Sequence, residues 1–168
     1  SRFITLFDAF IFVLMQLTGA FLGALFAYCI NGEMPFIEPA DAYKEKYGAV
    51  FVIELVYSFT IAIVVINVAT AESQRGNFFY GVSIGMAVTA GICAGQRISG
   101  GAYNPAIGTA LSLTNVMRER GTIKYLWIYW LAPCLGGVLG GLSYYVLNAK
   151  EIQHIKQLRA QQEQQGLM

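Results

Sequence analysis

Long uncharged tracts alternate with short charged segments along this chain. The first tract, Ala9 to Gly32, has 24 residues without a charge, and a helix of that length extends about 36 Å, enough to cross the hydrocarbon core of a bilayer. Further apolar tracts cover about residues 47–71, 78–94 and 125–148, and the tract 47–71 contains one charged residue, Glu54. The third, at roughly 17 residues, is near the lower limit for crossing. The pattern predicts four membrane-spanning helices.

The uncharged segment from Ile98 to Val116 does not fit a fifth span. It is rich in glycine and serine at its start and becomes periodic from Pro105 onward. The part from Pro105 to Thr114 is too short to cross, and apolar tracts of about ten residues are often re-entrant. Asn104 followed by Pro105 is a typical helix start, with a capping residue before a proline at the first helical position. A loop that enters the bilayer and continues as a half-helix is therefore predicted.

Such a loop can form the wall of a pore. Non-helical backbone at membrane depth persists only beside protein or a water-filled cavity. Its carbonyls would turn toward water, the side-chain amide of Asn104 would donate hydrogen bonds, and the positive end of the half-helix would oppose cations and protons. The backbone positions expected to take part are Ser99, Gly100, Ala102 and Tyr103.

An internal repeat divides the chain into unequal parts. An offset of 117 residues aligns Gly19 with Gly136 and Gly23 with Gly140, and small residues four apart let helices approach closely in lipid, although such spacings also arise by chance. The alignment predicts an incomplete inverted repeat: residues 1–30 form the last helix of a truncated first unit, and residues 47–148 form a complete second unit with its half-helix at about 104–114. Residues 31–46 are an aqueous loop, and residues 149–168 are a polar tail, either solvated or weakly amphipathic and helical.

Composition limits the function classes. Hydrophobic residues make up 56% of the chain and charged residues 12%, which excludes intrinsic disorder and argues against an ordinary soluble domain. The net charge of +1 with scattered lysines and arginines leaves no basic surface for nucleic acid. One histidine and three cysteines within apolar tracts form no metal-ligand or catalytic set, so neither an enzyme, a metal nor a cofactor is expected. The lipid bilayer is the first expected partner, and the near-equal numbers of basic residues on its two sides do not orient the chain.

Three strings resemble the aquaporin, or major intrinsic protein, family over about residues 5–148: FVIELVYSF, SGGAYNPAIG and WIYWLAPCLGGVLGG. The resemblance implies an all-α helical bundle with a pore at the NPA box, which is Asn104, Pro105 and Ala106. It also implies that the family's first two helices and first NPA half-helix are absent from this sequence. Without another segment to close it, this chain alone is not expected to conduct.

The resemblance further places the selectivity filter at Ile92, Gly101 and Ile107. Ile107 stands where the family has an arginine, and Arg97 in the same segment is an alternative source of positive charge. An apolar filter would be wider and drier than a water-selective one, which favours small neutral solutes or a closed hydrophobic plug.

Two further features concern the environment of the spans: the charged residue Glu54 and a group of aromatic residues near the start of the last span. A charge in lipid is costly, so Glu54 is expected to face protein or a cavity. By resemblance it would accept hydrogen bonds from amides near residues 97–101, and a carboxylate at the membrane interface is the alternative. Trp127, Tyr129 and Trp130 are expected to form an interfacial aromatic belt.

Two functions remain open on the sequence. The first is a transmembrane channel for water or small neutral solutes, with selectivity in doubt because of Ile107. The second is a non-conducting, aquaporin-derived accessory subunit of a larger membrane complex. The resemblance implies a homotetramer, whereas a dead pore would favour a hetero-assembly. An integral membrane location follows in either case, and the membrane itself stays undetermined.

Overall fold

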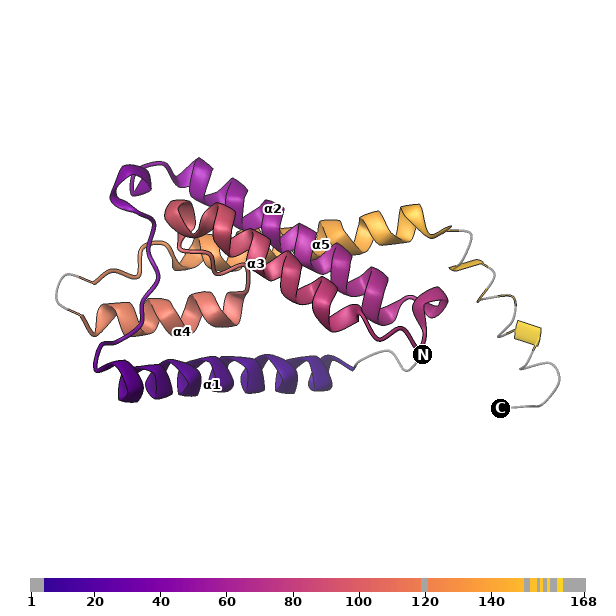
Figure 1. The fold of residues 1–168 in the computed structure, drawn as a ribbon, viewed down its shortest axis with the longest axis horizontal. Helices are drawn as coiled ribbons and strands as arrows, with labels where there is room; N and C mark the ends of the chain where they lie inside the picture. Colours follow the sequence, from indigo (N-terminus) through magenta and orange to yellow (C-terminus); the bar gives the residue numbers. More distant parts are fainter. Residues whose placement is uncertain are drawn as a thin grey trace.

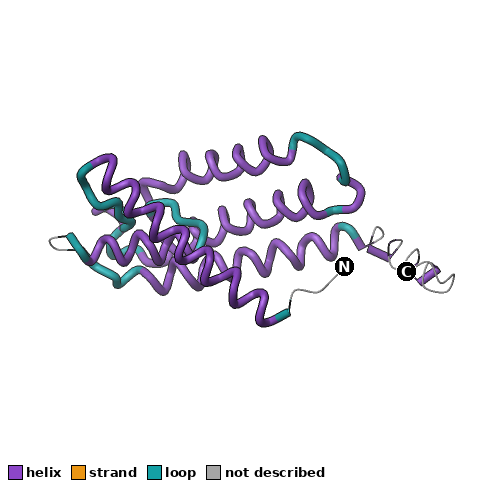
Figure 2. The backbone as a smooth tube through the Cα atoms, turned by 90° about the horizontal axis from the view of Figure 1, so that it is seen from below, coloured by secondary structure: helices purple, strands orange, loops and turns teal. Residues whose placement is uncertain are grey.

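The structure, a computed structural model, describes residues 5–118 and 121–149, together with positions 152, 153, 155, 157, 160 and 161. Within these residues it is all-α and contains no strand (Figure 2). The main helices are α1 (Leu6–Asn31), α2 (Tyr47–Val65), α3 (Tyr80–Ser99), α4 (Pro105–Val116) and α5 (Leu126–Leu147). Shorter turns are η1 (Asp41–Tyr43), the π-helical η2 (Ile66–Thr70) and η3 (Glu72–Gln74). The described tail positions are helical, and the rest of the predicted polar tail lies outside the described residues.

Three helices are long and apolar enough to cross a bilayer. They are α1, α2 extended by its π-turn to Thr70, and α5. The remaining predicted span, at about residues 78–94, corresponds to α3, which has 20 residues and packs along α2. It is long enough to cross but is less apolar than the other three. These helices confirm an integral membrane protein.

The end of α3 corrects the sequence prediction. The apolar tract was expected to stop near Ala94 and the loop to begin by Ile98, whereas the helix continues to Ser99. Gln96 and Arg97 have helix propensities close to those of apolar residues, so the helix continues through them and through Gly95. The helix ends at Gly100, whose φ of +93° is left-handed and thus favours glycine.

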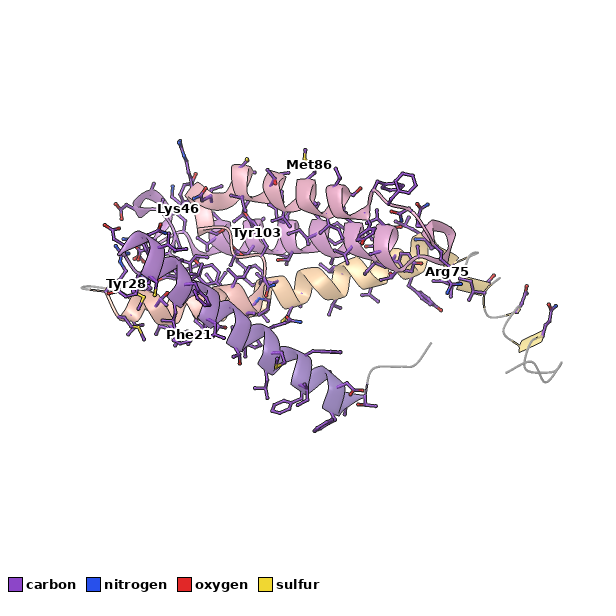
Figure 3. The ribbon with its side chains drawn as sticks, turned by 60° about the horizontal axis from the view of Figure 1, so that its bottom comes forward. Phe21, Tyr28, Lys46, Arg75, Met86 and Tyr103 are labelled. Carbon is purple, nitrogen blue, oxygen red and sulfur yellow. The ribbon has the colours of Figure 1, made fainter. Side chains whose placement is uncertain are left out.

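Helices α2 and α5 approach each other closely at two glycines of α5. A Cβ at Gly136 would lie 2.6 Å from the carbonyl oxygen of Leu55, and one at Gly140 would lie 2.9 Å from the Cβ of Ala62. Backbones this close require small residues, as the repeat predicted for α5. A Cβ at the corresponding Gly19 or Gly23 of α1 would meet no described atom within 4 Å, and the N-terminal half of α1 diverges from the bundle (Figure 3).

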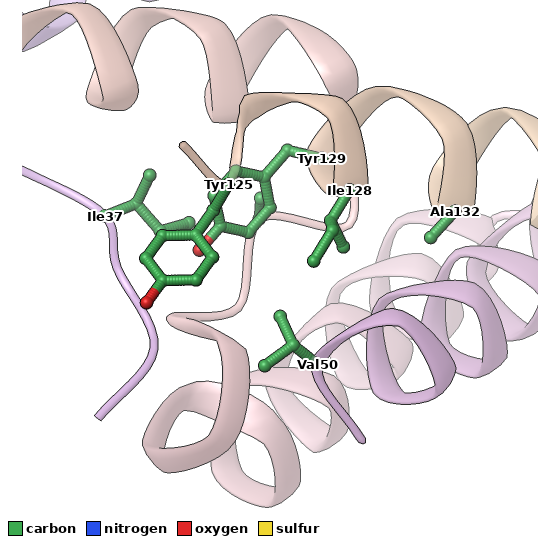
Figure 4. Close-up of a cluster of buried hydrophobic side chains, with 7 residues drawn as sticks. Ile37, Val50, Tyr125, Ile128, Tyr129 and Ala132 are labelled. Carbon is green, nitrogen blue, oxygen red and sulfur yellow. The ribbon is translucent and has the colours of Figure 1, made fainter. Parts of the chain in front are cut away.

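The segment between α1 and α2 is only partly aqueous. Its charged residues face outward, where Lys44 lies 2.8 Å from the Asp41 carboxylate, and the hydrogen bond from Lys44 lowers the pKa of Asp41. Ile37 and Pro39, however, are buried. Ile37 joins a buried cluster with Val50 and residues from the start of α5 (Figure 4). The apolar members of an otherwise charged loop thus fasten it to the bundle.

The half-helix α4 covers only part of the length of α1 (Figure 1). It starts at Pro105, as the sequence predicted, and ends at Val116, two residues beyond Thr114. The Thr114 hydroxyl donates to the carbonyl oxygen of Pro35, and the Trp130 indole N–H of α5 donates to the Thr109 hydroxyl at 2.8 Å. These bonds hold both sides of α4 and leave its first turn beside the middle of the neighbouring helices.

Candidate functional site

The loop between α3 and α4 has a backbone that only a few residue types adopt readily. Gly100 and Gly101 have φ values of +93° and +78°, and Tyr103 follows with a φ of +49°. Glycine enters this left-handed region at no steric cost, whereas a tyrosine there is uncommon. The α1–α2 segment leaves no room at Gly100, because a Cβ there would overlap Ile37. The two glycines of the SGG sequence therefore allow the chain to turn from α3 into α4.

Glu54 holds this loop from inside the bundle. Its carboxylate is fully buried and accepts hydrogen bonds from the Ala102 N–H at 3.0 Å and the Tyr103 N–H at 2.7 Å. The Ser99 hydroxyl donates to the same carboxylate at 2.6 Å. The resemblance implied that main-chain amides near residues 97–101 would donate to Glu54. Most of those amides donate instead within α3, which continues to Ser99. The carboxylate of Glu54 therefore faces protein, and not a lipid-facing or solvent-facing surface of the bundle.

Ser99 and Tyr129 form a second link to the loop. Ser99 is the last residue of α3, and its carbonyl oxygen accepts a hydrogen bond from the Tyr129 hydroxyl. That carbonyl therefore faces α5, where Tyr129 is fully buried. The interfacial belt predicted for Trp127, Tyr129 and Trp130 is wrong for Tyr129, because a bulky side chain in the first turn of α5 points into the bundle.

Asn104 caps the half-helix with a fixed orientation. Its backbone is extended and its side-chain oxygen accepts a hydrogen bond from the Ala106 N–H at 2.8 Å. The oxygen is thus occupied, and the NH₂ group remains to donate. No acceptor for that NH₂ group lies within the described part of the chain, and Asn104 is partly exposed. Asn104 can therefore offer two N–H donors at the positive end of α4.

The three filter positions lie on three different elements. Ile92 is on α3, Gly101 is in the loop and Ile107 is in the first turn of α4. Ile92 and Ile107 are 41% and 42% exposed, so neither apolar side chain is covered by the described part of the bundle. Arg97 lies in the last turn of α3 and not in the loop, and it is exposed.

A partly enclosed, mostly apolar cavity of about 150 Å³ adjoins the NPA box. Its lining is drawn from the middle of α1, the start of α4 and the first half of α5: Val13, Gln16, Leu17, Asn104, Pro105, Ala106, Trp130 and Cys134. Since Val13 to Leu17 are central in α1, the cavity places the start of α4 about halfway across the span. Sequence reasoning missed Gln16, although an amide inside an uncharged tract is itself a signal of a polar contact.

The geometry of this site agrees with a comparison of the whole sequence. Residues 1–144 match the family described as major intrinsic protein. The chain belongs to the major intrinsic protein family. Family membership agrees with the buried glutamate, the loop and the half-helix described above.

Individual members of the major intrinsic protein family are similar at moderate identity. Aquaporin TIP2-3 of Arabidopsis thaliana is 31% identical over 146 residues, which are 84% of this chain and 55% of that protein. Aquaporin-5 of Homo sapiens is 29% identical over 151 residues, or 86% and 54%. Glycerol uptake facilitator protein-like 6 of Lactiplantibacillus plantarum is 25% identical over 157 residues, or 90% and 70%. The chain spans about half the length of these two aquaporins.

Proposed function

We propose that this chain forms one side of a channel for water or small neutral solutes. The observation that supports this most directly is the bond between the Asn104 side-chain oxygen and the Ala106 N–H. It orients the remaining NH₂ group of Asn104 at the end of a half-helix located midway along α1. A fixed donor at that depth can align a single file of solute molecules.

The start of α4 also supports a barrier to cations. The backbone N–H groups of the first helical turn carry a partial positive charge, and Pro105 and Ala106 place that turn beside the cavity. No acidic side chain lines this cavity in the described residues. A positive potential without a compensating carboxylate favours neutral solutes over cations.

The filter positions favour small neutral solutes over strict water selectivity. Ile92 and Ile107 offer methyl groups, and Gly101 offers no side chain at all. Such a constriction has few hydrogen-bond donors to replace those of bulk water, so partly apolar solutes would be less disfavoured. One relative bears the name of a glycerol uptake facilitator, in line with this choice.

The proposed domain organisation follows the internal repeat. Residues 1–30, of which 5–30 are described, would be the last helix of a first unit, and residues 47–148 the second unit with its half-helix at 104–114. The unpaired glycine face of α1 at Gly19 and Gly23 would receive a helix equivalent to α2. Two further spans and a half-helix, from this gene product or another chain, would then close the pore, in a homotetramer or a larger assembly.

One observation favours a second candidate, an accessory subunit that does not conduct. Ile107, directly after the NPA box, cannot supply the charge and hydrogen bonds that the family's arginine would. Arg97 is exposed in the last turn of α3. A pore without its filter arginine can persist as a packing surface in a membrane complex, with no catalytic chemistry in either case.

Osmotic permeability separates the two candidates. The full-length gene product would be reconstituted into liposomes, with empty liposomes as reference and Asn104→Asp as the matched variant. Aspartate also caps helices well, so α4 should persist while the amide donors are lost. The channel proposal expects water or glycerol flux above the reference and a loss of that flux in Asn104→Asp. Flux equal to that of empty liposomes would reject the channel and favour the accessory subunit.

A further inference from the structure

The side chain of Tyr103 makes contacts that a purely backbone role in the loop does not require. Tyr103 directly precedes Asn104 and has a left-handed φ of +49°. A residue with a Cβ keeps this conformation only where its surroundings fix it. Its side chain is 7% exposed and lies inside the bundle (Figure 3). The surroundings of the ring therefore contribute to holding the turn, beside the hydrogen bond from the Tyr103 N–H to Glu54.

The ring occupies a slot on α3 between two glycines one helical turn apart. The Tyr103 hydroxyl donates a hydrogen bond to the Gly91 carbonyl oxygen at 2.7 Å. A Cβ at Gly91 would lie 3.0 Å from Cε2 of the ring, and a Cβ at Gly95 would overlap the hydroxyl oxygen. The slot thus exists because both positions lack a side chain.

Two other elements close the slot. The Tyr57 ring of α2 packs against the Tyr103 ring, with centroids 5.4 Å apart and a 47° angle between planes. On the loop side, the Tyr103 ring lies 3.6 Å from the Cβ position of Gly101. Tyr103 is therefore fixed at both ends: its main-chain N–H by Glu54 of α2, and its hydroxyl by Gly91 of α3.

This arrangement connects the loop to the helix that bears the first filter position. Ile92 directly follows Gly91, so the hydroxyl bond fixes the level of Ile92 relative to Gly101 and Asn104. We propose that Tyr103 is a positioning residue, whose side chain in the Gly91–Gly95 slot sets the spacing of α3 from the pore loop and the orientation of the Asn104 amide. Its effect on solute choice rests on the proposed channel function, whereas its effect on the loop does not.

A rescue experiment tests this role. Gly95→Ala places a methyl group where the Tyr103 hydroxyl lies, and Tyr103→Phe in the same chain removes that oxygen. Gly85→Ala on the same helix is the matched control, because a Cβ at Gly85 meets no described atom within 4 Å. The readout is amide hydrogen exchange of the segment 99–107, measured by mass spectrometry on the full-length protein in lipid nanodiscs.

The expected result is a selective loosening of the loop. Exchange in 99–107 should rise about tenfold or more in Gly95→Ala and return toward the Tyr103→Phe level in the double variant. Gly85→Ala should match the unmodified protein. If Gly95→Ala does not fold, Tyr103→Phe alone should still raise exchange about threefold in 99–107 and not in α5, because it loses the bond to Gly91. Equal exchange in Gly95→Ala and Gly85→Ala, no rescue in the double variant, or unchanged exchange in Tyr103→Phe would overturn the proposal.

The ratio of glycerol to water permeability gives a second readout. In proteoliposomes, Gly95→Ala should change this ratio and the double variant should restore it, because the spacing of the filter positions follows the ring. If the unmodified protein is impermeable, the channel function fails, and the exchange measurement still decides the role of Tyr103. An unchanged ratio in a conducting Gly95→Ala variant would contradict the effect on selectivity.

Discussion

The buried carboxylate of Glu54 accepts a hydrogen bond from the main-chain N–H of Tyr103 at 2.7 Å, across a sequence separation of 49 residues. A second bond, from the Ala102 N–H, runs to the same side chain. These amides have no helix or sheet partner, and α2 supplies the acceptor that the loop lacks. The loop can therefore keep an irregular backbone at membrane depth, where an unsatisfied amide costs several kcal/mol.

Glu54→Gln should loosen the loop between α3 and α4 without removing volume. The glutamine has one acceptor oxygen in place of two, so at least one of the two loop amides loses its partner. We expect a loss of about 1–3 kcal/mol in the free energy of unfolding, measured by thermal unfolding in detergent. Glu33→Gln, at an exposed carboxylate outside the spans, is the control and should change little. An equal effect of both variants would contradict this role of Glu54.

Tyr129→Phe should destabilise the junction of α3 with the loop. It removes the hydroxyl that donates to the Ser99 carbonyl oxygen and leaves a polar group without that donor, at a cost of about 1–2 kcal/mol. Tyr145→Phe on the same helix, where the side chain is 58% exposed, should be close to neutral. Chemical unfolding of the purified protein in micelles measures both, and a neutral Tyr129→Phe would show that the bond contributes nothing to stability.

Gly136→Ala should separate α2 from α5. The added methyl group would lie 2.6 Å from the Leu55 carbonyl oxygen and 2.7 Å from the Phe59 nitrogen, and backbone atoms cannot move aside as a side-chain end can. Overpacking of this kind costs about 1–3 kcal/mol. Gly137→Ala, the next residue, meets no described atom within 4 Å and should be neutral or slightly stabilising, because alanine favours helix. The measurement is the thermal unfolding midpoint of each variant. Equal midpoints for Gly136→Ala and Gly137→Ala would refute the close contact of α2 and α5 at Gly136.

Ile107→Arg should make the proposed pore more selective for water. Ile107 is 42% exposed, so a longer side chain can be accommodated there. The arginine side chain would narrow the proposed constriction, and its charge and N–H donors would favour water. We expect the ratio of glycerol to water permeability in proteoliposomes to fall about tenfold. Ile107→Leu keeps the size and apolar character and should leave the ratio unchanged. The same ratio in Ile107→Arg and Ile107→Leu would place Ile107 outside the constriction.

The sequence predicted most of the helical framework, because hydrophobic tract length is a local property that lipid imposes directly. It located the start of α4 at Pro105 for the same kind of reason, since capping involves neighbouring residues. It misplaced the end of α3 and assigned Tyr129 to an interfacial belt. The first error arises because polar residues continue α3 beyond the apolar tract. The second arises because the Tyr129 hydroxyl has a partner inside the bundle, which the local pattern does not reveal.

The sequence by itself therefore determined an all-α membrane protein with a helix start at Asn104 and one charge, Glu54, inside a span. Only the tertiary structure decided that Glu54 binds the amides of Ala102 and Tyr103 and that the Tyr103 ring enters the slot at Gly91 and Gly95. Helix formation depends on residues within a few positions of each other, so it can be seen in the chain. The partners of a loop are chosen by helix packing between residues tens of positions apart, and that packing exists only in the folded molecule.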